Sequence, residues 1–163
     1  MAFLLYSHSM LRRLLYTPDD PIFTLLRAGL GMVFFAHGAQ KMLGWFGGAG
    51  YSRTVAMFTH GMGIPEPLAV LAILAEFLGG IGLILGLLTR VAAFGIAVNM
   101  VVAVFKVHMH NGFFMNWAGN KRGEGFEYHI LALAIAFAVL ARGAGAWSVD
   151  RLITAPSGRT PMR

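Results

Sequence analysis

The chain has 163 residues, of which 57% are hydrophobic and 12% charged, and its mean hydropathy of +0.67 is too high for a soluble domain of this size. Its net charge of +6 does not indicate a nucleic-acid partner, because the basic residues fall mostly at the ends of apolar segments, where they meet lipid headgroups. The absence of cysteine excludes disulfides, thiolate chemistry and iron-sulfur clusters. The composition predicts a single all-α domain over residues 1–163, embedded in the lipid bilayer.

The apolar segments predict a bundle of four transmembrane helices. In chain order, the expected spans cover about residues 21–42, 67–88, 91–107 and 127–142. The first span follows a turn in which Asp20 would cap the helix and Pro21 would occupy its first position. Pro65 and Pro67 open the second span, whose many glycines and alanines indicate close contacts between helices.

Shorter elements are expected between and before the spans. Residues 1–16 predict a helix lying in the membrane interface. Ser52 to His60 predict a short surface helix in the first outer loop, capped by Ser52 and stopped by Gly61. Thr89 and Arg90 would form a tight turn, after which a short third span stands nearly upright.

The distribution of Lys and Arg predicts the orientation in the membrane. Four spans place both termini and the Arg90 turn on one side, where basic residues outnumber those on the other side. This bias favours a multi-pass protein with both termini in the cytoplasm and both longer loops outside.

A carboxylate in the middle of the second span is the clearest functional signal. An ionisable side chain at mid-span costs about 2.5 to 3.5 kcal/mol, so Glu76 requires a partner or a purpose. Its neighbours on the helix surface are small, which indicates that it points into the bundle. Arg27 in the first span is the expected counter-ion. Such a pair would either fix helix register or form part of a proton or ligand site.

A second set of polar residues is expected at the outer end of the spans. The candidate ligand or proton site comprises Glu76, Arg27, His37, Gln40, Lys41, His108, Glu127 and His129. Most of these could converge on one vestibule, although interfacial side chains that reach for headgroups would give the same pattern. His37, which lies inside the span beside Gly38, is the best candidate for contact with a ligand.

The outer loop favours an apolar ring over a metal ion. His108 and His110 are two residues apart and share a face only in extended chain, so they are weak metal ligands, and an axial haem pair is no better supported. Phe113, Phe114 and Trp117 could cover a ring such as a quinone. No flavin or nucleotide motif is present.

Four stretches of the sequence resemble the DoxX family of small four-helix membrane proteins. They read RAGLGMVFFAHGAQKMLGWFGG, GIPEPLAVLAILAEFLGGIGLILGLLTR, VHMHNGFF and GAWSVD. The resemblance implies a four-helix bundle in a bacterial or archaeal inner membrane and an association with redox chemistry, since the related DoxD proteins belong to a thiosulfate to quinone oxidoreductase. This chain has no cysteine, which argues against direct sulfur catalysis.

Two functions are therefore expected. The first is a redox-associated accessory protein or subunit that binds a quinone or a similar amphipathic ligand within the bundle; if it is an enzyme, it would be part of a quinone-linked membrane oxidoreductase. The alternative is a non-enzymatic assembly or scaffold partner of a larger membrane complex, because the small residues and short loops suit helix association. Partners would be other membrane or oxidoreductase subunits, or a second copy of the chain.

Overall fold

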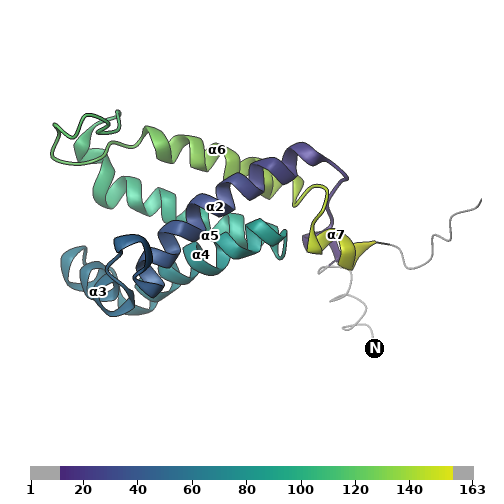
Figure 1. Ribbon diagram of the computed structural model, residues 1–163, viewed down its shortest axis with the longest axis horizontal. Coiled ribbons are helices and arrows are strands. Elements are labelled where there is room, and N and C mark those ends of the chain that lie inside the picture. The colour runs from purple at the N-terminus through teal and green to yellow at the C-terminus, as the bar shows by residue number, and fades with distance from the viewer. Residues whose placement is uncertain (1–11, 156–163) are drawn as a thin grey trace, which may run out of the picture.

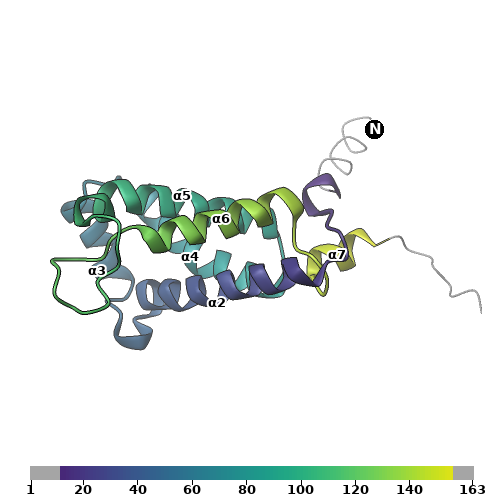
Figure 2. The ribbon, with the colours of Figure 1, turned by 90° about the horizontal axis from the view of Figure 1, so that it is seen from above.

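The computed structural model describes residues 12–155, and this range contains helices and loops but no strand. Four helices lie side by side along the long axis (Figures 1 and 2): α2 (Pro21–Leu43), α4 (Glu66–Leu85), α5 (Thr89–Ala103) and α6 (Glu127–Arg142). The all-α prediction is confirmed. Three helical segments are long and apolar enough to cross a membrane, namely α2, α4 and the continuous stretch Thr89–Asn111. The fourth, α6, has 16 residues.

The two ends of the bundle carry different short elements (Figure 1). One end holds the 3-10 helix η1 (Trp45–Gly47), α3 (Tyr51–Ala56), the π-helix η2 (Met57–Gly61) and the loop of residues 112–126. We call it the α3 end. The opposite end holds α7 (Val149–Thr154) and the turn between α4 and α5, and we call it the α7 end. At the α3 end, α5 continues as η3 (Val104–His108) and η4 (Met109–Asn111).

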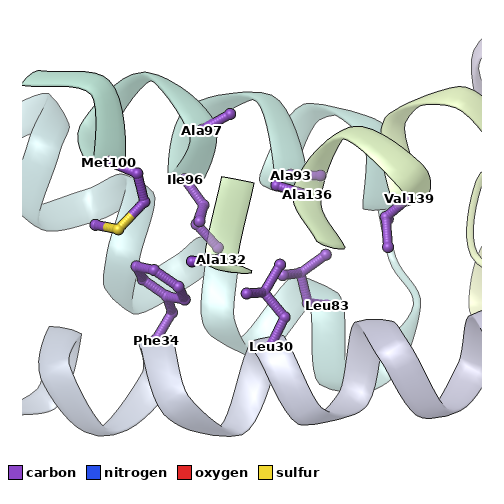
Figure 3. Packing of buried hydrophobic residues seen from close by; sticks show 10 residues of the cluster. All are labelled: Leu30, Phe34, Leu83, Ala93, Ile96, Ala97, Met100, Ala132, Ala136 and Val139. Atoms are coloured by element: carbon purple, nitrogen blue, oxygen red, sulfur yellow. The ribbon is translucent and has the colours of Figure 1, made fainter. Parts of the chain in front are cut away.

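The core joins all four long helices. Figure 3 shows Leu30 and Phe34 of α2 against small side chains of α5 and α6. The alanines among them are Ala93, Ala97, Ala132 and Ala136. Because lipid tails are as apolar as these side chains, close packing and not hydrophobic burial holds such helices together.

Glycines bring α2 and α4 into backbone contact. A Cβ atom at Gly31 would lie 2.9 Å from the carbonyl oxygen of Gly80, and one at Gly38 would lie 2.7 Å from the carbonyl carbon of Glu76. Both approaches are too short for any side chain, so these positions admit only glycine. The close helix contacts that the small residues predict are therefore present, and they fix the register of α2 against α4.

The start of α2 is built as the sequence predicts. Asp20 is the N-cap and accepts a hydrogen bond of 2.9 Å from the Ile22 N–H, and Pro21 is the first helical residue. Gly44 ends the helix in the left-handed conformation, with φ +73°.

Several local predictions are wrong. Thr89 and Arg90 are the first residues of α5, and the turn before them runs through Gly86 and Leu88, both at positive φ. The third long helix is not short, because it continues to Asn111 as a π-helix and a 3-10 turn. The N-cap of α3 is Gly50 and not Ser52, since the helix begins at Tyr51. The interfacial helix expected over residues 1–16 lies mostly outside the described residues, of which 12–15 are helical.

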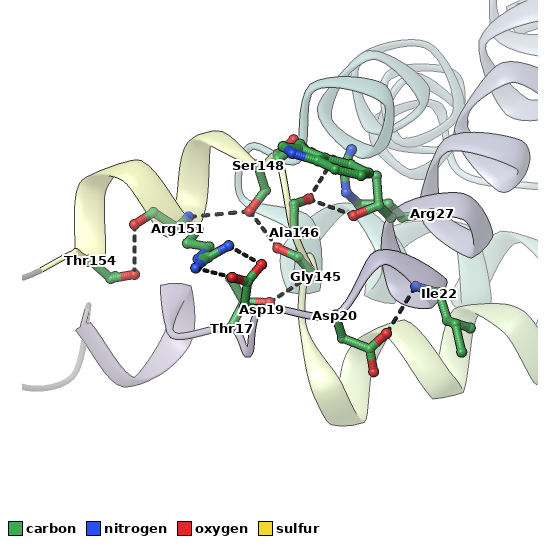
Figure 4. Close-up of polar contacts among 12 residues, drawn as sticks. Thr17, Asp19, Asp20, Ile22, Arg27, Gly145, Ala146, Ser148, Arg151 and Thr154 are labelled. Carbon is green, nitrogen blue, oxygen red and sulfur yellow. Dashed lines mark hydrogen bonds and ion pairs between the residues drawn. The ribbon is translucent and has the colours of Figure 1, made fainter.

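The α7 end is closed by a buried guanidinium. Arg27 is 1% exposed and donates hydrogen bonds of 2.6 to 2.7 Å to the carbonyl oxygens of Leu83, Ile84, Ala144 and Trp147, with a longer one to Ala146. The last carbonyls of α4 and those of the loop before α7 therefore meet on one side chain of α2. Figure 4 shows Arg27 beside this loop. The predicted pairing of Arg27 with Glu76 is wrong. The two residues lie at different depths, because Glu76 faces Gly38, about 16 Å further along α2.

A carboxylate of α7 caps the adjacent helix. Asp150 is 2% exposed and accepts hydrogen bonds from the backbone N–H groups of Leu88, at 2.7 Å, and Thr89, at 2.9 Å. This side chain satisfies the free donors at the start of α5, which has no cap of its own. Arg151 forms an ion pair with Asp19 beside it (Figure 4).

Candidate functional site

A cavity of about 430 Å³ opens inside the bundle at the α3 end. Its walls come from α2, η2, α4, α5 with η3, and the start of α6, so residues far apart in the sequence face one space. The polar side chains that line it are His37, Lys41, Glu76, Asn99, Lys106, His108, Glu124, Tyr128 and His129. Apolar side chains, among them Phe34 and Met100, form the rest of the wall.

An ion pair lies in the wall between α2 and α4. Lys41 Nζ contacts Glu76 Oε2, and the side chains are 25% and 10% exposed respectively. The glycine at position 38 permits this pairing, because it lets the backbone of α2 pass directly over Glu76. The counter-ion of Glu76 is therefore Lys41, which the sequence places one turn beyond His37. A carboxylate that pairs with one ammonium group can still accept a hydrogen bond or a proton from a ligand.

Two histidines stack in the wall beside the loop of residues 112–126. The rings of His108 and His129 are 4.1 Å apart between centroids and tilted by 44°. The Nδ1 atom of His108 lies 2.9 Å from the carbonyl oxygen of Glu124. Since a carbonyl only accepts, this nitrogen carries the proton, and the Nε2 atom of a neutral His108 ring is a hydrogen-bond acceptor.

His129 is buried without a protein partner. The residue is 5% exposed, and its Nδ1 atom is enclosed and has no hydrogen-bond partner. Buried polar atoms are nearly always satisfied, so this unpaired nitrogen in a residue of the cavity wall is an exception.

An amide in the middle of α5 presents a further acceptor. The Nδ2 atom of Asn99 donates a hydrogen bond of 2.7 Å to the carbonyl oxygen of Ala72. This contact fixes which end of the amide is the nitrogen, so Oδ1 is an acceptor, while Nδ2 keeps a second hydrogen that can donate.

The segment predicted to lie on the membrane surface covers this cavity. Met57, Phe58, Met62 and Ile64 contribute to the wall. Lys106 Nζ, from the opposite side, donates a hydrogen bond of 3.3 Å to the carbonyl oxygen of Met62. The short helix after the first span is thus part of the site.

Five of the eight site candidates from the sequence line the cavity: His37, Lys41, Glu76, His108 and His129. Three do not. Arg27 belongs to the α7 end, Gln40 donates to the carbonyl oxygen of Phe46 at 3.3 Å, and Glu127 accepts from the Met115 N–H at 2.8 Å. Gln40 and Glu127 therefore stabilise loops.

Sequence reasoning missed Asn99 and Glu124 as site residues. An asparagine in the middle of an apolar span was a usable signal, because an amide there needs a partner. Glu124 gave none, since its position depends on how the loop folds back. His110 is exposed and does not line the cavity, and within residues 12–155 no three His, Asp or Glu side chains are grouped as a metal site requires.

Known proteins are similar in sequence to this chain. The family model of DoxX matches residues 22–109, which is more than half of the chain. The "Inner membrane protein YqjF" of Escherichia coli is 33% identical over 68% of this chain and 79% of its own length. The "Putative oxidoreductase CatD" of Bacillus subtilis is 29% identical over 71% and 75%, and an uncharacterized protein of Haemophilus influenzae is 32% identical over 77% and 85%. No solved structure matches the chain.

Proposed function

Because the chain belongs to the DoxX family of membrane proteins, we propose that it is a redox-associated accessory protein or subunit that binds a quinone or a similar amphipathic ligand in the cavity at the α3 end. The name of the Bacillus subtilis relative, an oxidoreductase, supports the redox association. As an enzyme component, the chain would belong to a quinone-linked membrane oxidoreductase.

The observation that carries the proposal is the composition of the cavity wall. A volume of about 430 Å³ falls in the range of about 300 to 1,000 Å³ typical of small-molecule sites. Such sites combine apolar walls with a few convergent polar groups, and here the ion pair of Lys41 with Glu76, the Asn99 amide and the two histidines supply those groups. Apolar walls suit a ring, and the polar groups suit its oxygen substituents.

The proposed setting is a bacterial or archaeal inner membrane, crossed by α6 as a fourth span beside the three longer helices. The name of the Escherichia coli relative supports the membrane. The sequence carries more Lys and Arg on the side expected to hold both termini, which supports cytoplasmic termini and would open the cavity toward the opposite side.

The alternative of an assembly or scaffold partner has less support. Small residues favour it only where they face outward, and Gly31, Gly38 and Gly80 all contact helices of the same chain.

Glu76→Gln tests the proposal against a matched control. The protein would be purified in mild detergent, its lipophilic ligands extracted and identified by mass spectrometry, and the binding of added decylubiquinone measured by titration. We expect a co-purified quinone and a loss of affinity of about tenfold in Glu76→Gln, because the amide cannot retain the ion pair with Lys41.

Glu66→Gln provides the control, since Glu66 lies in the first turn of the same helix, is exposed and does not line the cavity. Its decylubiquinone affinity should equal that of the unaltered protein. A protein that carries no quinone and binds none when it is added would refute the proposed function.

A further inference from the structure

Two atoms in the cavity wall are hydrogen-bond acceptors whose role the protein fixes. His108 Nε2 is an acceptor in the neutral ring because Nδ1 donates to the Glu124 carbonyl. Asn99 Oδ1 is an acceptor because Nδ2 donates to the Ala72 carbonyl. Both are held by backbone oxygens, which cannot reverse their role.

We infer that the cavity selects the reduced, hydroxyl-bearing form of a quinone-type ligand, a quinol, over the oxidised quinone. The inference rests on the proposed function and names the ligand form of that same site. A quinone carries carbonyl oxygens, which only accept, so it leaves His108 Nε2 and Asn99 Oδ1 without a donor. A quinol hydroxyl donates as well as accepts and can satisfy either atom.

The two adjacent histidines, His108 and His129, increase this preference for the hydroxyl form. The Nδ1 atom of His129 is enclosed and has no acceptor to receive a proton, so the neutral ring places its proton on Nε2, where it can donate to a ligand. His108 and His129 then present an acceptor and a donor on rings 4.1 Å apart. One hydroxyl oxygen can donate to the first and accept from the second, whereas a carbonyl oxygen can meet only the second.

The charged groups of the wall do not reverse this preference. Lys41 is paired with Glu76, and its remaining N–H groups can donate to a quinone and to a quinol alike. Lys106 donates to the Met62 carbonyl and is exposed, so water competes for its other N–H groups. Glu76, as a further acceptor, favours the hydroxyl form.

The test compares duroquinol with duroquinone, which have the same carbon skeleton. Their dissociation constants for the purified protein would be measured anaerobically in nanodiscs. We expect duroquinol to bind about tenfold more tightly, since an acceptor that duroquinone covers without donating to it loses its hydration and gains no hydrogen bond. In His108→Phe, which keeps an aromatic ring against His129, the ratio should fall below about threefold, because neither compound then meets the acceptor that discriminates between them.

Two further variants test whether a change in the ratio comes from the lost acceptor and not from misfolding. Asn99→Leu should lower the ratio independently of His108→Phe. His110→Phe, two residues further along the chain and outside the cavity, should leave the ratio unchanged. Duroquinone binding as tightly as duroquinol to the unaltered protein would overturn the inference and leave the proposed function standing, as would an unchanged ratio in both cavity variants. If neither compound binds, the proposed function fails, and the inference fails with it.

Discussion

The α7 end and the α3 end bury comparable polar groups but satisfy them differently. At the α7 end the Arg27 guanidinium donates to five carbonyl oxygens, and both carboxylate oxygens of Asp150 accept from backbone N–H groups. The Thr89 hydroxyl there lacks a partner, yet the charged groups are paired. At the α3 end, His129 is buried without a partner inside a cavity. The polar groups that close the bundle and those that line the proposed ligand site therefore lie at opposite ends of the molecule.

Arg27→Leu should have the largest effect, because it removes the hydrogen bonds that close the α7 end. Removing the guanidinium leaves several buried carbonyl oxygens without a donor, which should lower the free energy of unfolding by about 4 kcal/mol. SDS titration of the purified protein would measure it. Decylubiquinone affinity of the fraction that remains folded should be unchanged, since Arg27 does not line the cavity.

Arg142→Leu is the matched control, because Arg142 is exposed and its guanidinium lies over the ring of Phe23. It should lower the free energy of unfolding by less than about 1 kcal/mol. Equal losses in the two variants would show that the buried guanidinium is not the closure of the α7 end.

Gly38→Ala should come next and affect both stability and binding. The added methyl group would meet the backbone at Glu76 and Phe77, so α2 must move away from α4, at a cost of about 3 kcal/mol. The same movement separates Lys41 from Glu76, so decylubiquinone affinity should fall as well. Thermal unfolding and ligand titration on one preparation would measure both.

Gly29→Ala provides the internal standard. A Cβ atom there meets nothing within 4 Å, and alanine favours the helix over glycine by up to about 1 kcal/mol. The variant should be as stable as the parent or more so. If Gly38→Ala were equally harmless, the glycine contact would not set the register of α2 on α4.

His129→Phe should change stability least, and unlike Arg27→Leu it should lower ligand affinity without lowering stability. Replacing an unsatisfied buried imidazole by a ring of similar shape removes a desolvation penalty, so the free energy of unfolding should rise by up to about 1 kcal/mol. Duroquinol affinity should nevertheless fall by about tenfold. A variant that loses stability would indicate that His129 has a structural role.

The sequence predicted the α3 end better than the α7 end for a physical reason. Counting along the helix placed His37 and Lys41 together near the outer end of the first span. It assigned the wrong partner to Glu76, because counting along each helix does not give the register between two helices. The partner of Arg27 could not be counted in this way, since it is a set of backbone carbonyls in a loop before α7. Every residue has a backbone carbonyl group, so the sequence does not show which carbonyls will accept hydrogen bonds from a side chain.

The role of Asp150 could not be predicted either, because its partners are backbone N–H groups far away in the sequence. Nothing near it marks it as the cap of a helix that begins about 60 residues earlier. Likewise the stacking of His108 on His129 depends on how the loop of residues 112–126 folds back, which helix periodicity does not describe.

The cap supplied by Asp150 also sets an order of events during biosynthesis. The N–H groups of Leu88 and Thr89 find their carboxylate 62 and 61 residues later in the chain. At about 5 to 20 residues per second, a ribosome needs about 3 to 12 seconds to reach it. Throughout that interval the newly inserted hairpin of α4 and α5 has an uncapped turn, so the bundle can lock only after its last helix has been made.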